Sequence, residues 1–272
     1  MSKIAKGFSA KTLRPRGDIL KLRRSFIVRH FERLSILNTI NPRNAQELVN
    51  ELHSDYGKTI NAFSANHSGG LLKFTELVCN CYKTFELFNK DKSPSQRAID
   101  VGGYVFLAID NVYVSVKLLV LGYFAPSGNS MRQSLESVCM AILLSHNGNI
   151  NIGTDKKPKE VDFFKLYSTG DKKALPHKSL GYVDVNKNAL GVSEKAIAAF
   201  FVGKDHYNEY SHPNKLSLAS RMVGVDGGSF IVGDEYDEDK KTAYEKELRD
   251  RIKYVSIIPK FIDVVYERVK NV

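Results

Sequence analysis

Apolar residues recur at helical spacing over most of the chain. The longest apolar stretch covers residues 97–124, where Asp110 and Lys117 are the only charges between Val101 and Phe124. Each charge would cost about 2.5–3.5 kcal/mol at the centre of a membrane span, so the pattern favours a buried core helix. The same periodicity predicts further helices at residues 18–37, 45–66, 71–88, 131–144, 193–212 and 240–269.

Glycine and proline mark where these helices are expected to end. Gly69 and Gly70 separate the second helix from the third, and residues 125–130 are expected to form a linker. Pro213 stops the helix before it, because a residue that precedes proline is disfavoured in the α region. Pro259 is expected to kink the last helix.

Two segments depart from the helical pattern. Residues 146–192 are rich in Gly, Asn, Lys and Pro, which predicts a long irregular insert with one short helix near residues 161–167. Residues 221–225 and 229–233 flank a glycine turn and predict a small β-hairpin. The predicted fold is therefore mainly α: a helical bundle with a β-hairpin before its C-terminal helix.

Positive charge is concentrated at the start of the chain. Residues 1–33 carry ten lysines and arginines against Asp18 and Glu32, a balance of +8 out of a net charge of +10. We therefore expect a basic N-terminal arm and amphipathic helix over residues 1–40, followed by a bundle domain over residues 41–272. Such a local positive field attracts phosphate polyanions. The expected nucleic-acid contacts are Arg14, Arg16, Lys21, Arg23, Arg24 and Arg29.

Two other interpretations of the basic segment stay open. Its cations could simply solvate the outer face of a core helix, or the amphipathic helix at residues 18–37 could bind an anionic membrane surface. The segment has no ladder of aromatic residues, so nucleic-acid binding through it would be recognition of the backbone. RNA or DNA is the expected partner, and a membrane surface is the less favoured one.

Composition excludes several classes of protein. Cys79, Cys81 and Cys139 form no disulfide framework and are expected to be free thiols. The spacing of Cys79 and Cys81 does not suit a zinc site, and the chain has neither a phosphate-binding glycine loop nor a dinucleotide motif. With no signal-peptide pattern at its start, the chain is expected to be cytoplasmic and to need neither metal nor cofactor.

One set of polar residues interrupts helices that should be packed. Arg132 and Glu136 are spaced to share a helix face and to pair. Tyr207 and Tyr210 share a face of a later helix, and His212 lies at its end before Pro213. The sequence thus offers two polar segments that a bundle could bring together.

These two segments resemble a bacterial family of helical domains of unknown function. The shared pattern is Arg-x3-Glu on one helix, a Tyr-x2-Tyr-Ser-His-Pro-like run, a glycine hairpin and a terminal helix, and it covers roughly residues 100–268. This chain has one residue fewer between Ser211 and His212 than that pattern. More distantly, the layout resembles HEPN-type domains, many of which are dimeric ribonucleases with an Arg-x4-6-His motif. The literal match to that motif here is Arg24-x5-His30.

The resemblance implies a homodimer and a metal-independent RNA-cleaving effector of a bacterial defence or toxin system. In that chemistry His212 would be the general base, Arg132 would stabilise charge on the phosphorus, and Glu136 would orient one of them. Tyr207 or Tyr210 would donate a hydrogen bond. Two alternatives stay open: a ligand-binding pocket, or a non-enzymatic interaction or scaffold protein in which the same residues form a structural network.

Overall fold

The computed structural model describes residues 35–36, 44–90, 93–154, 156–212, 215–223, 229–230 and 234–270. The six basic residues expected to contact nucleic acid lie outside these ranges, and so does most of the expected helix at residues 18–37. Its last part is described, but as a strand instead of a helix: β1 (Ser35–Ile36).

The chain divides into two compact units. The smaller unit combines residues 1–52 with residues 221–233 and holds four described elements: β1, α2 (Ala45–Leu52), β4 (Met222–Val223) and β5 (Ser229–Phe230). Strand β5 pairs with β4 in antiparallel fashion, which confirms the predicted hairpin. On its other side β5 pairs in parallel with β1, a strand that the helical pattern of the sequence concealed.

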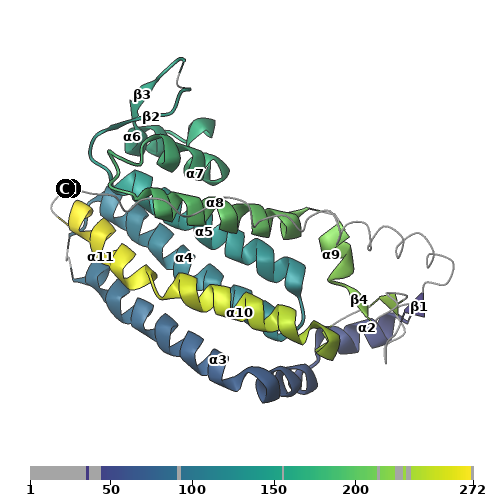
Figure 1. The fold of residues 1–272 in the computed structure, drawn as a ribbon. Helices are drawn as coiled ribbons and strands as arrows, with labels where there is room; N and C mark the ends of the chain where they lie inside the picture. Colours follow the sequence, from purple (N-terminus) through teal and green to yellow (C-terminus); the bar gives the residue numbers. More distant parts are fainter. Residues whose placement is uncertain are drawn as a thin grey trace, which may run out of the picture. The chain divides into compact units, whose positions relative to one another are not determined.

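The larger unit is a helical bundle, as the apolar periodicity predicts (Figure 1). Its long helices are α3 (Gly57–Phe85), α4 (Gln96–Val120), α5 (Phe124–Ser145), α8 (Glu194–Ser211), α10 (Lys241–Val255) and α11 (Ile258–Val269). Short helices are η2 (Glu86–Asn89), α9 (Lys215–Ala219) and η4 (Glu238–Lys240). The predicted kink in the last helix is a complete break: α10 ends before α11 begins, and Pro259 occupies the first turn of α11.

Helix α4 lies at the centre of the bundle and packs against α3, α5, α10 and α11. Its first turn is capped by the Ser95 hydroxyl, which accepts a hydrogen bond from the backbone N–H of Ala98. One face is fully buried, with Val101, Val105, Ala108, Ile109, Val112 and Leu119 in the core. In the described part of the chain, α4 is also the one helix long and apolar enough to cross a membrane.

Helix α5 begins earlier than its sequence suggests. Residues 125–130, expected to form a linker, are its first turns. Pro126 is tolerated there because the first turn needs no N–H at that position. Gly128 lies against the Tyr210 ring, where a Cβ would approach to 2.7 Å. Farther along α5, Leu135 contacts Gly203, which precedes Tyr210 on α8, so the two helices run antiparallel.

Helix α3 also differs from the expectation. The predicted helix at residues 45–66 is broken after α2, and Tyr56 takes a left-handed φ of 53° just before α3. The break expected at Gly69 and Gly70 is present as a kink inside α3: His67, two residues earlier, has a non-helical φ of −131° and ψ of 15°. A Cβ at Gly70 would meet Leu248 Cδ2 at 2.7 Å, so this glycine also allows α10 to approach α3 closely.

The insert at residues 146–192 is more regular than predicted. It contains an antiparallel pair, β2 (Asn149–Asn151) and β3 (Glu160–Asp162), followed by α6 (Phe163–Ser168), η3 (Lys172–Ala174) and α7 (Pro176–Val185), drawn at the top of Figure 1. Asn186 ties the hairpin to α7, because its side chain accepts the N–H of Asn151 and donates to the Asn151 carbonyl oxygen. Because polar hydrogen bonds hold this part of the insert together, its sequence shows no periodic pattern of apolar residues, and its regular structure could not be predicted.

Candidate phosphate-binding site

Arg132 and Glu136 form the ion pair that their spacing predicts. Arg132 Nε donates to Glu136 Oε1 at 3.0 Å on one face of α5. Both side chains remain partly open to solvent, with 23% and 16% of their surfaces exposed. The pair is therefore neither sealed in the core nor freely solvated.

The pair lines a small hollow between α5, α7 and α8. Lys204 of α8 and His177 of α7 contribute the other polar walls, and Leu135, Cys139, Leu180 and Phe200 form an apolar floor. Burial raises the pKa of the Cys139 thiol to about 12, so that this cysteine is a neutral part of the floor. The cavity volume of about 10 Å³ admits one oxygen-sized group.

The N-terminal end of α7 supplies His177 to the hollow. The N-cap residue, Leu175, has no side-chain acceptor for the first N–H groups, and Pro176 begins the first turn. An uncapped helix N-terminus carries partial positive charge and stabilises nearby anions. This end of α7 thus adds positive potential beside two full cations.

The charges around the hollow do not cancel. Arg132 and Lys204 are opposed by Glu136 alone. Within the described part of the chain, neither the Nη atoms of Arg132 nor Lys204 Nζ takes part in a hydrogen bond or ion pair. Donors that lack acceptors around a positive hollow suit an oxyanion, such as an oxygen of a phosphate group.

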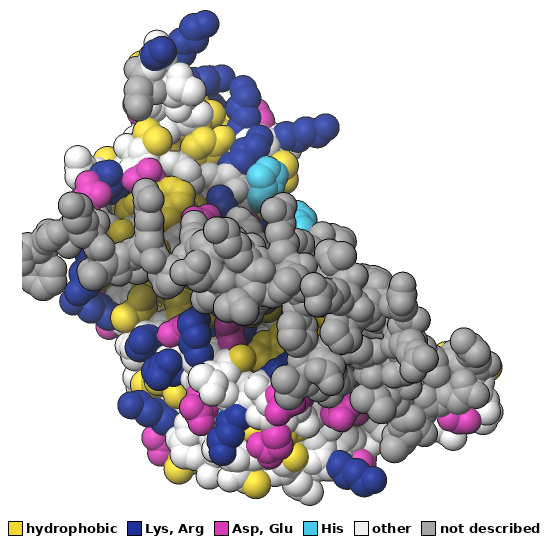
Figure 2. All heavy atoms as spheres, turned by 45° about the vertical axis from the view of Figure 1, so that its right-hand side comes forward, with side chains coloured by type: hydrophobic (Ala, Val, Ile, Leu, Met, Phe, Trp, Pro, Cys, Tyr) yellow, Lys and Arg dark blue, Asp and Glu magenta, His cyan; other side chains and the backbone are white. Residues whose placement is uncertain are grey.

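A lysine-rich surface continues from the hollow over the insert. It consists of exposed or half-exposed side chains on the β2–β3 connection, α6, η3 and α7: Lys156, Lys157, Lys159, Lys165, Lys172, Lys173 and Lys178. Figure 2 shows dark-blue side chains gathered on this upper lobe. Helix α7 contributes to both features, since His177 lines the hollow and Lys178 belongs to the lysine surface.

A second polar cluster lies in the core and was not predicted. Arg251 of α10 is 1% exposed, and its Nη1 donates to Glu247 Oε2 at 2.5 Å. Its Nε and Nη2 donate to the hydroxyls of Ser115 and Ser127 on α4 and α5. On the other carboxylate oxygen, Glu247 Oε1 lies 2.7 Å from His206 Nε2. The network thus joins α4, α5, α8 and α10.

The buried carboxylate of Glu247 is held ionised. Burial alone would raise its pKa, but the hydrogen bond from His206 and the charge of Arg251 outweigh burial and lower the pKa to about 2. An ionised carboxylate only accepts hydrogen bonds, so His206 Nε2 carries the proton and Nδ1 holds the lone pair in the neutral ring. His206 has 30% of its side chain exposed, and its ring packs edge to face against Tyr207 and Tyr210.

The other predicted catalytic residues lie apart from the hollow. Tyr207 is 4% exposed and its ring packs 5.5 Å from the Arg251 guanidinium carbon, while burial raises its pKa to about 12. Tyr210 is half-buried, and burial raises its pKa as well. His212 is exposed at the C-terminal end of α8 in extended conformation. No contact between described residues joins His212 to Arg132, and their shared catalytic role stays a prediction.

The described residues contain no group of three or more His, Cys, Asp or Glu side chains placed to hold a metal ion. Cys79, Cys81 and Cys139 are free thiols, as expected. In comparisons with protein-family models, curated proteins and solved structures, nothing matches this chain.

Proposed function

We propose that this protein is nucleic-acid-associated and binds RNA through the phosphate backbone. The observation that carries the proposal is the convergence of Arg132, His177 and Lys204, from three different helices, beside the lysine surface. The seven lysines of that surface are interspersed with three described carboxylates, those of Glu160, Asp162 and Asp171. This leaves a positive field that a polyanion would complement.

The chemistry of this surface favours contacts with phosphates over reading of bases. Flexible lysine ammonium groups act as point charges, and the hollow admits one oxygen atom at a time. Such contacts release counterions, and for a single strand each lowers the slope of log affinity against log salt by about 0.7. Binding should therefore be strong at low salt and depend weakly on sequence.

Charge reversal on the β2–β3 connection tests the proposal. In the triple variant Lys156→Glu/Lys157→Glu/Lys159→Glu, affinity for a labelled single-stranded RNA should fall roughly tenfold or more at low salt. The salt slope should flatten by about 2, because three phosphate contacts are lost. Fluorescence anisotropy over a salt series measures both quantities.

The matched control reverses three exposed lysines elsewhere, in the variant Lys73→Glu/Lys83→Glu/Lys260→Glu. Both variants change the net charge equally, so a general charge effect would weaken both alike and contradict the proposal. Wild-type protein that fails to bind RNA or DNA at low salt would contradict it too. The single variant Lys204→Ala then reports on the hollow, since this lysine has no partner among the described residues to release.

Metal-independent RNA cleavage is a second candidate function, favoured by the half-exposed His206 ring held by buried Glu247. His206 Nδ1 would take the proton of a ribose 2′-hydroxyl while its oxygen forms a bond to phosphorus. The bond from phosphorus to the 5′-oxygen then breaks, and that oxygen takes a proton from water. The role in bacterial defence or toxicity that the family resemblance implies depends on this activity.

Cleavage predicts a loss of activity without a loss of binding. Replacing His206 with glutamine should slow RNA cleavage in the presence of a chelator by roughly 100-fold or more. The exposed His53→Gln variant should cleave normally, and RNA affinity should change in neither. The variants Arg132→Ala and His212→Ala test the set expected from the sequence in the same assay. If RNA stays intact after incubation with the wild-type protein, the cleavage proposal is wrong, and the protein acts by binding or as a scaffold.

A further inference from the structure

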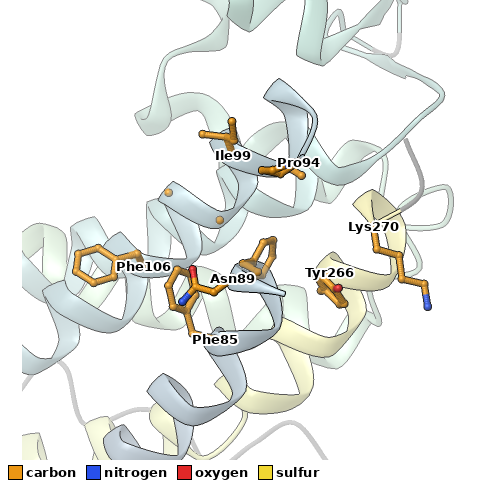
Figure 3. Close-up of a pocket in the computed structure, with 11 residues that line it drawn as sticks. Phe85, Asn89, Pro94, Ile99, Phe106, Tyr266 and Lys270 are labelled. Atoms are coloured by element: carbon orange, nitrogen blue, oxygen red, sulfur yellow. The ribbon is translucent and has the colours of Figure 1, made fainter. Parts of the chain in front are cut away.

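A larger cavity of about 330 Å³ opens between η2, α4 and α11 (Figure 3). Its volume lies in the range typical of small-molecule sites. Most of its wall is aromatic or aliphatic, and its lining residues are Phe85, Phe88, Asn89, Pro94, Ala98, Ile99, Gly102, Gly103, Phe106, Tyr266 and Lys270.

The aromatic rings come from four elements, α3, η2, α4 and α11, and leave part of their surface open. Phe88 contacts Phe85 at 5.7 Å and Tyr266 at 5.2 Å between ring centroids, the second contact edge to face. Phe106 lies 5.9 Å from Phe85 and is still 43% exposed. Planar, partly exposed rings around one cavity suit a planar guest that can stack.

Two glycines on α4, the buried Gly102 and the exposed Gly103, line the cavity. At Gly102 a Cβ would approach the Phe88 ring to 3.1 Å, so packing within the protein accounts for that glycine. At Gly103 a Cβ would meet nothing within 4 Å, yet glycine destabilises a helix interior relative to alanine. Packing does not require Gly103, and its missing side chain leaves this part of the cavity wall open.

The rim supplies two polar groups of different kinds. The amide of Asn89 offers both donors and an acceptor, and Figure 3 shows it beside the Phe85 ring. Lys270 lies at the edge, and in Figure 3 its flexible side chain extends past Tyr266 with the ammonium directed away from the rings. Its ion pair with the exposed Glu267, at 2.5 Å, is a surface pair that a ligand anion can replace at little cost.

From these groups we infer a nucleotide-binding site: the cavity takes a nucleobase between its aromatic rings, with the phosphate of the same nucleotide on Lys270. A nucleobase uses the ring faces by stacking and the Asn89 amide by hydrogen bonding at its edge. A fatty acid would use the apolar wall and Lys270 but make no hydrogen bond to the exposed Asn89 amide. The combination of stacking surface, amide and cation therefore favours a nucleotide.

The cavity lies at the end of the bundle that carries the lysine surface. Arg97, one residue before the lining residue Ala98, pairs with Asp162 of β3 at 3.6 Å. Its guanidinium carbon also lies 4.6 Å from the centroid of the Phe164 ring on α6. One unpaired base of a backbone-bound strand could thus enter the cavity, an extension that rests on the proposed RNA binding, whereas binding of a free mononucleotide does not.

Filling the cavity tests the inference. Isothermal titration with AMP, GMP, CMP and UMP should give saturable binding of at least one of them at one site per chain. In Gly103→Leu, whose side chain has room to enter the cavity, that affinity should fall at least tenfold. The control is Gly69→Leu, another helical glycine with open space around its Cβ, which should bind as wild type does.

Two rim variants separate the contacts. Asn89→Ala should weaken nucleotide and nucleoside alike, whereas Lys270→Ala should weaken only the nucleotide. Saturable binding of octanoate with none of any nucleotide would overturn the inference, and so would no binding of any of these ligands or equal losses in both leucine variants. Because Gly103→Leu leaves the lysine surface intact, its salt-dependent affinity for RNA shows separately whether the proposed backbone binding holds.

Discussion

Replacing Arg251 with methionine should lower the free energy of unfolding by about 3–5 kcal/mol, because it leaves the Glu247 carboxylate charged and buried without its main partner. The loss of the arginine costs less at the two serine hydroxyls that accept its hydrogen bonds. Ser115 and Ser127 also donate their hydroxyl protons to backbone carbonyl oxygens, at 2.7 and 2.6 Å, and keep those bonds. Urea denaturation at neutral pH measures the loss.

A double variant isolates the charge effect. In Arg251→Met/Glu247→Leu both buried charges are gone, and most of the lost stability should return, because a buried ion pair often gains little over well-packed apolar residues. The control, Arg249→Met, removes an exposed arginine from the same helix and should change stability by no more than about 0.5 kcal/mol. A cost at Arg251 as small as at Arg249 would contradict the buried network.

Helices with a sustained apolar face could be predicted from the sequence. Helices α4 and α8 both have such a face, and the structure places both close to their predicted bounds. Errors occurred where a residue's usual role was overridden by packing. Gly128 was interpreted as part of a linker, yet it lies inside α5, where the Tyr210 ring leaves no room for a Cβ.

The buried network was hidden by its surroundings. Glu247 and Arg251 belong to a run of alternating charges on α10, which is typical of a solvated helix face. Their spacing held a signal, however, because they follow Tyr244 and precede Val255 on the stripe that α10 buries. A charged pair at i and i+4 within an apolar stripe predicts a buried ion pair better than composition does.

Half of the hollow's polar wall could be predicted and half could not. Arg132 and Glu136 pair within one helix, so local spacing is sufficient. His177 and Lys204 reach the same hollow from α7 and α8, and their positions depend on the tertiary packing of the insert. The sequence instead pointed to His212, which follows Lys204 on α8 but lies at the exposed end of the helix.

The turn between α4 and α5 holds the second large expected effect, since it fixes the helix that carries Arg132. Gly122 has a φ of 78°, and a Cβ there would lie 2.1 Å from the backbone oxygen of Glu235. Gly122→Ala should therefore cost roughly 1–2 kcal/mol for the left-handed conformation and about 1–3 kcal/mol more for displacing the neighbouring backbone. Thermal and urea denaturation measure the total.

Gly170 separates these two contributions. It has a similar φ of 69°, but a Cβ there would meet nothing within 4 Å. Gly170→Ala should therefore show only the conformational cost of about 1–2 kcal/mol. If both variants lose the same stability, the backbone of Glu235 does not lie as close to Gly122 as described. If Gly122→Ala loses more and also weakens RNA binding by a protein that is still folded, the start of α5 sets the geometry of the hollow.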